Sequence, residues 1–157
     1  MAVLVKKPDV VQLRRNEKKW TKTLMEAGFT VIPSVFINRQ AKLGLQPLDL
    51  NIILYLASLW WHADNPPFPS KQTIAAAIGV KSPSTIRKRI TRMVRDGILS
   101  REERKSPEHG QQSNIYGLGP LIKMATPLAE KIIEERKQKE VKRREGLRRR
   151  PRLRAVK

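Results

Sequence analysis

The chain has 157 residues, and its 33 lysines and arginines against 14 acidic residues give a formal charge of +19. This length indicates one domain with extensions, and the charge favours a polyanionic partner, either nucleic acid or an anionic membrane surface. Cysteine is absent, which excludes disulfides and thiolate metal sites. No signal peptide is recognisable, and the longest apolar run is too short to span a bilayer. We therefore expect a soluble, cytoplasmic protein with no membrane partner and no cofactor.

The positive charge is concentrated at the two ends of the sequence. Residues 1–23 contain seven basic and two acidic residues, and residues 142–157 contain nine basic residues and one acid. Residues 28–80 are nearly neutral, with three basic and two acidic residues. Basic ends around a neutral core are typical of a folded module with nucleic-acid-binding arms.

The first predicted elements are short. Residues 1–20 are polar and are expected to form at most one helical turn, near Val10–Arg15. Pro33 suits the first turn of a helix, which we expect to run to about Lys42 and to end at Gly44.

The segment from Leu48 to Trp61 is the most apolar part of the sequence. Pro47 opens this predicted helix, and Asp49 lies near the positive end of its dipole. Apolar side chains occupy nearly every face, and a helix of that kind is buried or shared with a partner. We expect it to supply the contact of a homodimer. The stiff turn "ADNPPFP" that follows cannot continue a helix.

Two short helices come next, each with a capping residue before it and a glycine after it. Two helices around a glycine turn, the second of them basic, form a helix-turn-helix, whose second helix enters the major groove of DNA. The signals in chain order are Ser70 before helix 71–78, Gly79 after it, Ser82 and Pro83 before helix 84–96, and Gly97 at its end.

The second of these helices has an apolar side and a basic side. Ile86, Ile90, Met93 and Val94 recur at i, i+4, i+7 and i+8, so they should face the core. The other sides carry basic and hydroxyl side chains, which suit guanine, other bases and phosphates. A solvated basic face is the alternative interpretation. The predicted DNA contacts of this helix are Ser84, Thr85, Arg87, Lys88, Thr91, Arg92 and Arg95.

A β-hairpin is predicted after the basic helix. Residues 98–104 and 113–118 are expected to be its strands, joined by the polar loop "KSPEHGQQ". In a winged helix this hairpin is the wing, which touches the DNA backbone or minor groove, whereas an ordinary surface hairpin would make no such contact. The predicted DNA contacts of the wing are Arg104, Lys105, Gln111 and Gln112.

The sequence ends with a predicted helix over residues 127–144 and the cationic tail "KRREGLRRRPRLR". The tail should attract phosphate independently of sequence, through counterion release. A disordered solubilising tail and an RNA-binding arm are the alternatives. The predicted phosphate contacts are Arg143, Arg144, Arg148, Arg149, Arg150 and Arg152.

Residues 29–121 resemble a helix-turn-helix family found in bacterial, plasmid and phage proteins of replication initiation or transcription regulation. The resemblance is carried by "FTVIPSVFINRQAKLGLQPLDLNIILYLASLWW", "PPFPSKQTIAAAIGV", "STIRKRITRMVRDGILSREER" and "SNIYGLGPLI". It implies a winged-helix domain that binds double-stranded DNA, and a location in the bacterial cytoplasm or nucleoid. It does not imply a particular promoter or origin, since function depends on the site.

We therefore predict a mainly α protein with a small β-hairpin wing, a winged helix-turn-helix followed by a C-terminal helix and a basic tail. The expected divisions are a basic arm over residues 1–27, the DNA-binding domain over 28–121, and the helix and arginine-rich tail over 122–157. The chain offers no constellation for catalysis, and His62 and Asp64 are only a weak metal signal. The alternatives are an RNA-binding or ribonucleoprotein accessory subunit, and an adaptor that binds a replication or transposition protein.

Overall fold

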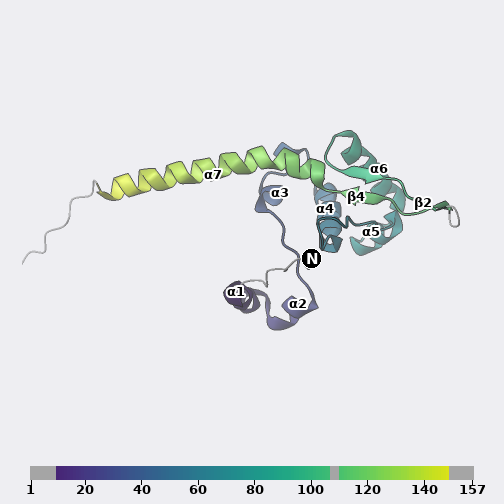
Figure 1. Ribbon diagram of the computed structural model, residues 1–157, viewed down its shortest axis with the longest axis horizontal. Helices are drawn as coiled ribbons and strands as arrows, with labels where there is room; N and C mark the ends of the chain where they lie inside the picture. The colour runs from purple at the N-terminus through teal and green to yellow at the C-terminus, as the bar shows by residue number, and fades with distance from the viewer. Residues whose placement is uncertain (1–9, 107–109, 149–157) are drawn as a thin grey trace, which may run out of the picture. The chain divides into compact units, whose positions relative to one another are not determined.

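The computed structural model describes residues 10–106 and 110–148 (Figure 1). The chain divides into two compact units, Met1–Ile32 and Pro33–Lys157. The predicted fold class is confirmed, since the described residues are mainly helical and include a small antiparallel hairpin and a C-terminal helix.

The first unit contains two short helices, α1 (Val10–Trp20) and α2 (Lys22–Ala27). The expectation of at most one helical turn in residues 1–20 is therefore wrong. The α1 sequence is rich in Gln, Leu, Arg, Glu and Lys, and their high helix propensity outweighs its low apolar content. Thr21 separates the two helices: its φ is 73°, and its hydroxyl accepts a hydrogen bond from the Leu24 amide at 3.5 Å.

The second unit begins with two small helical pieces in place of the one helix predicted from Pro33 to Lys42. These pieces are α3 (Ser34–Asn38) and a 3-10 turn, η1 (Ala41–Leu43). Phe36 and Leu43 are buried, so tertiary packing holds both pieces although no continuous helix joins them. Gly44 ends the segment, as predicted, with a φ of 66°.

Helix α4 (Pro47–Leu59) forms the centre of the second unit. Ile52, Ile53 and Leu56 are completely buried, and α4 packs against α5 and α6 of its own domain. Trp61, just beyond the helix, is 72% exposed. Much of the apolar surface of α4, which was predicted to supply a homodimer contact, therefore lies in the core of its own domain.

Helices α5 (Lys71–Ala77) and α6 (Pro83–Arg95) form the helix-turn-helix, with bounds within one residue of the predicted ones. The turn between them depends on Gly79, whose φ of 73° is a left-handed conformation that a side chain disfavours. This conformation lets the Val80 amide donate to the Ala75 carbonyl at 2.8 Å and so closes the end of α5. α4, α5 and α6 lie together in Figure 1, with the strands beside them.

The predicted hairpin is present but consists of two short ladders. β1 (Ser100–Glu102) pairs with β4 (Ile115–Gly117), and β2 (Lys105–Ser106) pairs with β3 (Gly110–Gln111). Both pairs are antiparallel. The wing therefore has an inner part beside the domain and an outer part toward its tip.

Contacts to the proline-rich turn before α5 fix the wing. The Tyr116 amide of β4 donates to the Pro67 carbonyl at 2.9 Å. The Arg104 guanidinium lies 4.5 Å from the centroid of the Phe68 ring, a cation–π contact. Its carbonyl accepts the Gln112 amide at 2.9 Å, which links the two ladders.

Ionisation of Tyr116 should lower the folding stability of the domain at alkaline pH. Its side chain is buried, and burial raises its pKa above the ordinary 10.0, while the charge of Arg101 opposes the rise. A folded-state pKa above the unfolded one means that stability is fully present below about pH 10 and is lost as the pH rises through the folded pKa. We expect the Tm of the wild type to fall more steeply above about pH 10 than that of Tyr116→Phe, which lacks the titrating hydroxyl. Parallel Tm curves for the two proteins would contradict this assignment.

The C-terminal helix is longer than predicted. α7 (Gly119–Arg148) starts well before Pro127, which lies inside it, and only the buried Leu118 separates it from β4. The expected start at residue 127 is wrong because Leu121 and Ala125 are buried, where the first turns of α7 pack on α3 and η1. Pro127 has no amide hydrogen to donate, but tertiary packing keeps the helix continuous around it. Within the described residues, no helix is both long and apolar enough to cross a membrane.

Candidate nucleic-acid interface

Helix α6 presents its basic side to solvent because its other side is anchored in the core. Ile86, Ile90 and Met93 are completely buried. Of the predicted contacts on this helix, five are exposed and two, Thr85 and Arg92, are half-buried. The exposed ones are Ser84, Arg87, Lys88, Thr91 and Arg95.

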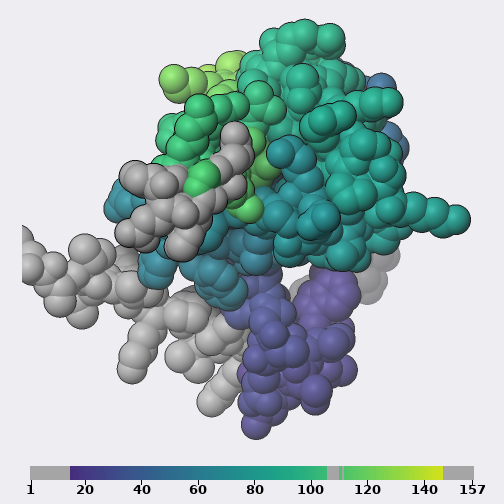
Figure 2. Space-filling view, turned by 90° about the vertical axis from the view of Figure 1, so that its right-hand side faces the viewer, coloured from purple at the N-terminus to yellow at the C-terminus, as the bar shows by residue number. Residues whose placement is uncertain are grey.

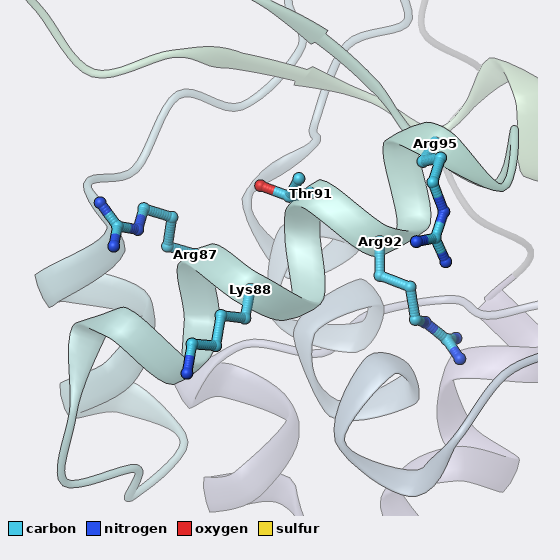
Figure 3. A pocket seen from close by; sticks show the side chains of 5 residues that line it. All are labelled: Arg87, Lys88, Thr91, Arg92 and Arg95. Carbon is cyan, nitrogen blue, oxygen red and sulfur yellow. The ribbon is translucent and has the colours of Figure 1, made fainter.

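An open hollow runs along this side of the helix (Figure 3). It is lined by Arg87, Lys88, Thr91, Arg92 and Arg95. Arg87 and Lys88 extend from the first half of α6, and Arg92 and Arg95 extend from its last turns. The lining contains four cations and no acid, so the hollow is suited to a polyanion.

The caps of α6 belong to the same surface. The Ser82 hydroxyl accepts the Ser84 amide at 3.3 Å, and its oxygen lies 2.7 Å from the Ser84 hydroxyl. Pro83 occupies the first turn, where no amide hydrogen is needed. The start of the helix is therefore exposed and fixed by local contacts.

Arg92 is held differently from its neighbours. Its Nη2 lies 2.6 Å from Asp49 Oδ2 and donates to the Gly44 carbonyl at 2.9 Å. Asp49 is completely buried at the start of α4, where its Oδ2 also accepts the Gln46 amide at 2.8 Å. The guanidinium of Arg92 thus binds α6 to the start of α4.

Arg89, which was not among the predicted DNA contacts, completes this arrangement. Its Nε lies 3.1 Å from Asp49 Oδ1, close enough for an ion pair but without the alignment of a hydrogen bond. Its Nη2 donates to the Gln46 side-chain oxygen. The cluster of Asp49, Arg89 and Arg92 is named here the Asp49 cluster. In the sequence, the position of Asp49 indicated only an interaction with the dipole of its own helix, because no local signal joins residues 43 positions apart.

Arg95 is mainly exposed, yet it has an acidic neighbour. Its Nε lies 2.9 Å from Asp96 Oδ1, and its side chain is 74% exposed. Asp96 Oδ2 is also 3.7 Å from Arg92 Nε. The C-terminal end of the basic side is therefore less positive than its start around Arg87 and Lys88.

The predicted wing residues are placed in different environments. Lys105 is exposed on β2, whereas Arg104 is half-buried against Phe68 and Gln112 is half-buried at the base of the wing. Gln111 lies in β3, and its side chain is outside the described part. Of these four residues, Lys105 is the most accessible cation.

A second, polar hollow lies between the base of the wing and the starts of α5 and α6. Its lining comes from three segments: Ser70, Lys71 and Gln72, then Pro83, and then Gln112, Ser113, Asn114 and Tyr116. In the space-filling view, the teal surface of the helix-turn-helix adjoins the green surface of the chain leaving the wing (Figure 2). The polar groups of the wing base and of the start of α5 thus belong to one continuous surface, which reaches the first residue of α6.

The predicted phosphate contacts of the tail fall partly on α7. Arg143 and Arg144 are exposed there, and Arg144 Nη2 lies 2.6 Å from Glu140 Oε1. Arg148 is the last residue of the helix. Arg149, Arg150 and Arg152 lie outside the described residues.

A metal site finds no support in the part of the chain that the structure covers. There, no group of three or more His, Cys, Asp or Glu side chains is arranged to hold a metal ion. His62 and Asp64 are exposed in the loop after α4.

Comparison with known proteins agrees with this geometry. A family model described as a helix-turn-helix domain matches residues 43–99, from the end of η1 through α6 to the residue before β1. No curated protein matches the chain. Over these residues the chain is similar to a helix-turn-helix domain, which agrees with the two helices α5 and α6 and the glycine turn between them.

Proposed function

We propose that this protein binds double-stranded DNA sequence-specifically, with α6 in the major groove, and acts in transcription regulation or replication initiation without catalysing a reaction. The observation that carries the proposal is the exposed basic side of α6, held outward by three buried apolar residues. A recognition helix needs this combination, because its base contacts are only as precise as its anchoring.

In this proposal the basic side chains of α6 have two roles. Arg87, Lys88 and Thr91 read base edges, with Ser84, Thr85 and Arg95 at bases or phosphates. Arg92 was also expected to contact DNA, but its guanidinium is engaged by Asp49 and by the Gly44 carbonyl. We therefore assign Arg92 to the support of α6, together with Arg89.

The other predicted contacts would hold phosphates. Lys105 on the wing and the arginines of the C-terminal segment are the cations for this purpose, and Gln112 lies in the polar hollow beside α6. Such contacts fix the register of the protein on DNA and carry little sequence information. A homodimer on paired half-sites also belongs to the proposal, since helix-turn-helix proteins commonly bind in that way.

Selection of bound duplexes from a random DNA pool tests the proposal. We expect an enriched motif, with each mismatch inside it costing about 1–3 kcal/mol of binding free energy. Two copies at a fixed spacing would indicate a dimer. Recovery of unrelated sequences with equal affinity would contradict sequence-specific binding, and tighter binding to RNA hairpins than to duplex DNA at the same salt would favour an RNA-binding protein.

A further inference from the structure

Along one face of helix α7, the side chains change from buried and apolar to exposed and cationic. Leu121, Ala125, Leu128 and Ile132 follow one another at intervals of four, three and four residues and therefore share a face. Leu121 and Ala125 are buried, Leu128 and Ile132 are half-buried, and every described side chain from residue 133 to 146 is exposed. Packing on the domain therefore ends after Ile132.

The same line continues beyond Ile132 with cations. Arg136, Lys139 and Arg143 come next, again at intervals of four, three and four residues. Lys131 and Lys142 flank them on one side, so that the five cations span an arc of about 140° at about 100° per residue. We call these five residues, Lys131, Arg136, Lys139, Lys142 and Arg143, the basic stripe. Its position continues the face by which α7 meets the domain.

The opposite face of this segment has a different charge. It carries Glu130, Glu134 and Glu145, with Lys137 and Arg144 among them, and Glu140 lies at its edge, about 40° from Arg136. The ion pair of Arg144 with Glu140 and the hydrogen bond of Gln138 to Glu134 both lie there. Glu135 is the one acid within the arc of the basic stripe.

The cations of the basic stripe outnumber its one acid, Glu135, which lies about one turn from Lys131 and from Lys139. Among the described residues, no carboxylate oxygen lies within ion-pair distance of their nitrogen atoms. They extend over about 18 Å of helix, at 1.5 Å per residue. This length corresponds to about five base pairs of a duplex, at 3.4 Å per base pair.

We propose that the basic stripe binds the phosphate backbone of the duplex that α6 reads, as a second and sequence-independent contact surface. The inference rests on the proposed function, and it separates Arg143, a phosphate contact, from Arg144, which is paired with Glu140. Charge complementarity identifies the partner as a polyanion, and the stripe has too few apolar residues to insert into a lipid surface. The basic stripe thus enlarges the electrostatic footprint beyond the helix-turn-helix.

The chain offers a charge-matched pair of variants for the test. Lys139→Gln with Arg143→Gln removes one lysine and one arginine from the basic stripe. Lys137→Gln with Arg144→Gln removes the same two charges from the opposite face of the same segment. All four positions are exposed, and glutamine is a good helix former, so circular dichroism should show folded helix in both proteins.

The readout is the dependence of duplex affinity on salt, from about 50 to about 200 mM. For the stripe variant we expect the slope of log K against log salt to fall by about 1.8, because each phosphate contact contributes about 0.9. Affinity at about 0.1 M salt should fall by more than about 10-fold. The opposite-face variant should change the slope by less than about 0.5, and Lys139→Arg with Arg143→Lys should behave like the wild type.

The outcomes separate this inference from the proposed function. Equal effects of the two charge-matched variants would show a general charge effect and would overturn the basic stripe while leaving DNA binding intact. A loss of RNA-hairpin affinity with unchanged duplex affinity would overturn it as well. Failure of the wild type to bind any duplex would instead contradict the proposed function itself.

Discussion

Asp49→Asn should lower the free energy of unfolding by about 3 kcal/mol, the lower end of the range of roughly 3–5 kcal/mol for breaking a buried ion pair. The carboxylate is completely buried, and its loss leaves two guanidiniums facing a neutral amide. The lower end applies because the side chains of Arg89 and Arg92 are 21% and 24% exposed and can partly rehydrate. Urea unfolding at neutral pH measures the loss.

Two further variants show whether the Asp49 cluster is the cause. Asp96→Asn removes an acid that also contacts arginines of α6, but its side chain is 35% exposed, so its loss should cost less than about 1 kcal/mol. Adding Arg92→Gln to Asp49→Asn should cost less than the sum of the two single changes, because both disrupt one interaction. Additive losses, or equal losses for Asp49→Asn and Asp96→Asn, would show that the cluster does not act as a unit.

Arg87→Ala should weaken binding to the selected DNA site by about 1–3 kcal/mol, a loss of roughly 5-fold to 150-fold in affinity, and should relax preference at one base pair. The side chain is exposed at the start of α6, and no described carboxylate is paired with it. Its removal should therefore leave the unfolding free energy nearly unchanged. Competition binding against single-base variants of the site measures the change in preference.

Two other variants serve as controls for the loss of DNA affinity in Arg87→Ala. Lys123→Ala removes a positive charge from the exposed surface of α7 and should reduce binding to all sequences alike, by much less. Arg92→Ala should lower stability first, because it breaks the contact with Asp49. If Arg87→Ala weakened all duplexes equally, Arg87 would be a phosphate contact and the base-reading role would pass to other residues of α6.

Local signals predicted the centre of this protein well. Ser70, Gly79 and Ser82 act at the helix ends where the sequence placed them, so the bounds of α5 and α6 were predicted to within one residue. The buried side of α6 also followed from its apolar period. Caps and periodicity depend on neighbours in sequence, and for this reason the sequence alone reveals them.

Features set by distant contacts were missed. The pairing of Arg92 with Asp49 joins two helices, and only the folded packing brings these charges together. In the same way, Pro127 suggested a helix start, but burial of Leu121 on α3 and η1 extends α7 toward β4. At Pro127, tertiary packing overrode a local signal for a helix start. Between α4 and α6, it created a contact of Arg92 with Asp49 that no local signal predicts.

The direct joint between wing and C-terminal helix has a mechanical consequence. Only the buried Leu118 lies between β4 and α7, and the helix stays packed on its own domain as far as Ile132. The part beyond the packed face, residues 133–148, is about 24 Å long, so a rotation of about 5° at Ile132 displaces its far end by about 2 Å. Because Leu118, Leu121 and Ala125 hold the base of α7 in the core, the cationic segment is a short rigid arm whose far end moves little when the wing moves.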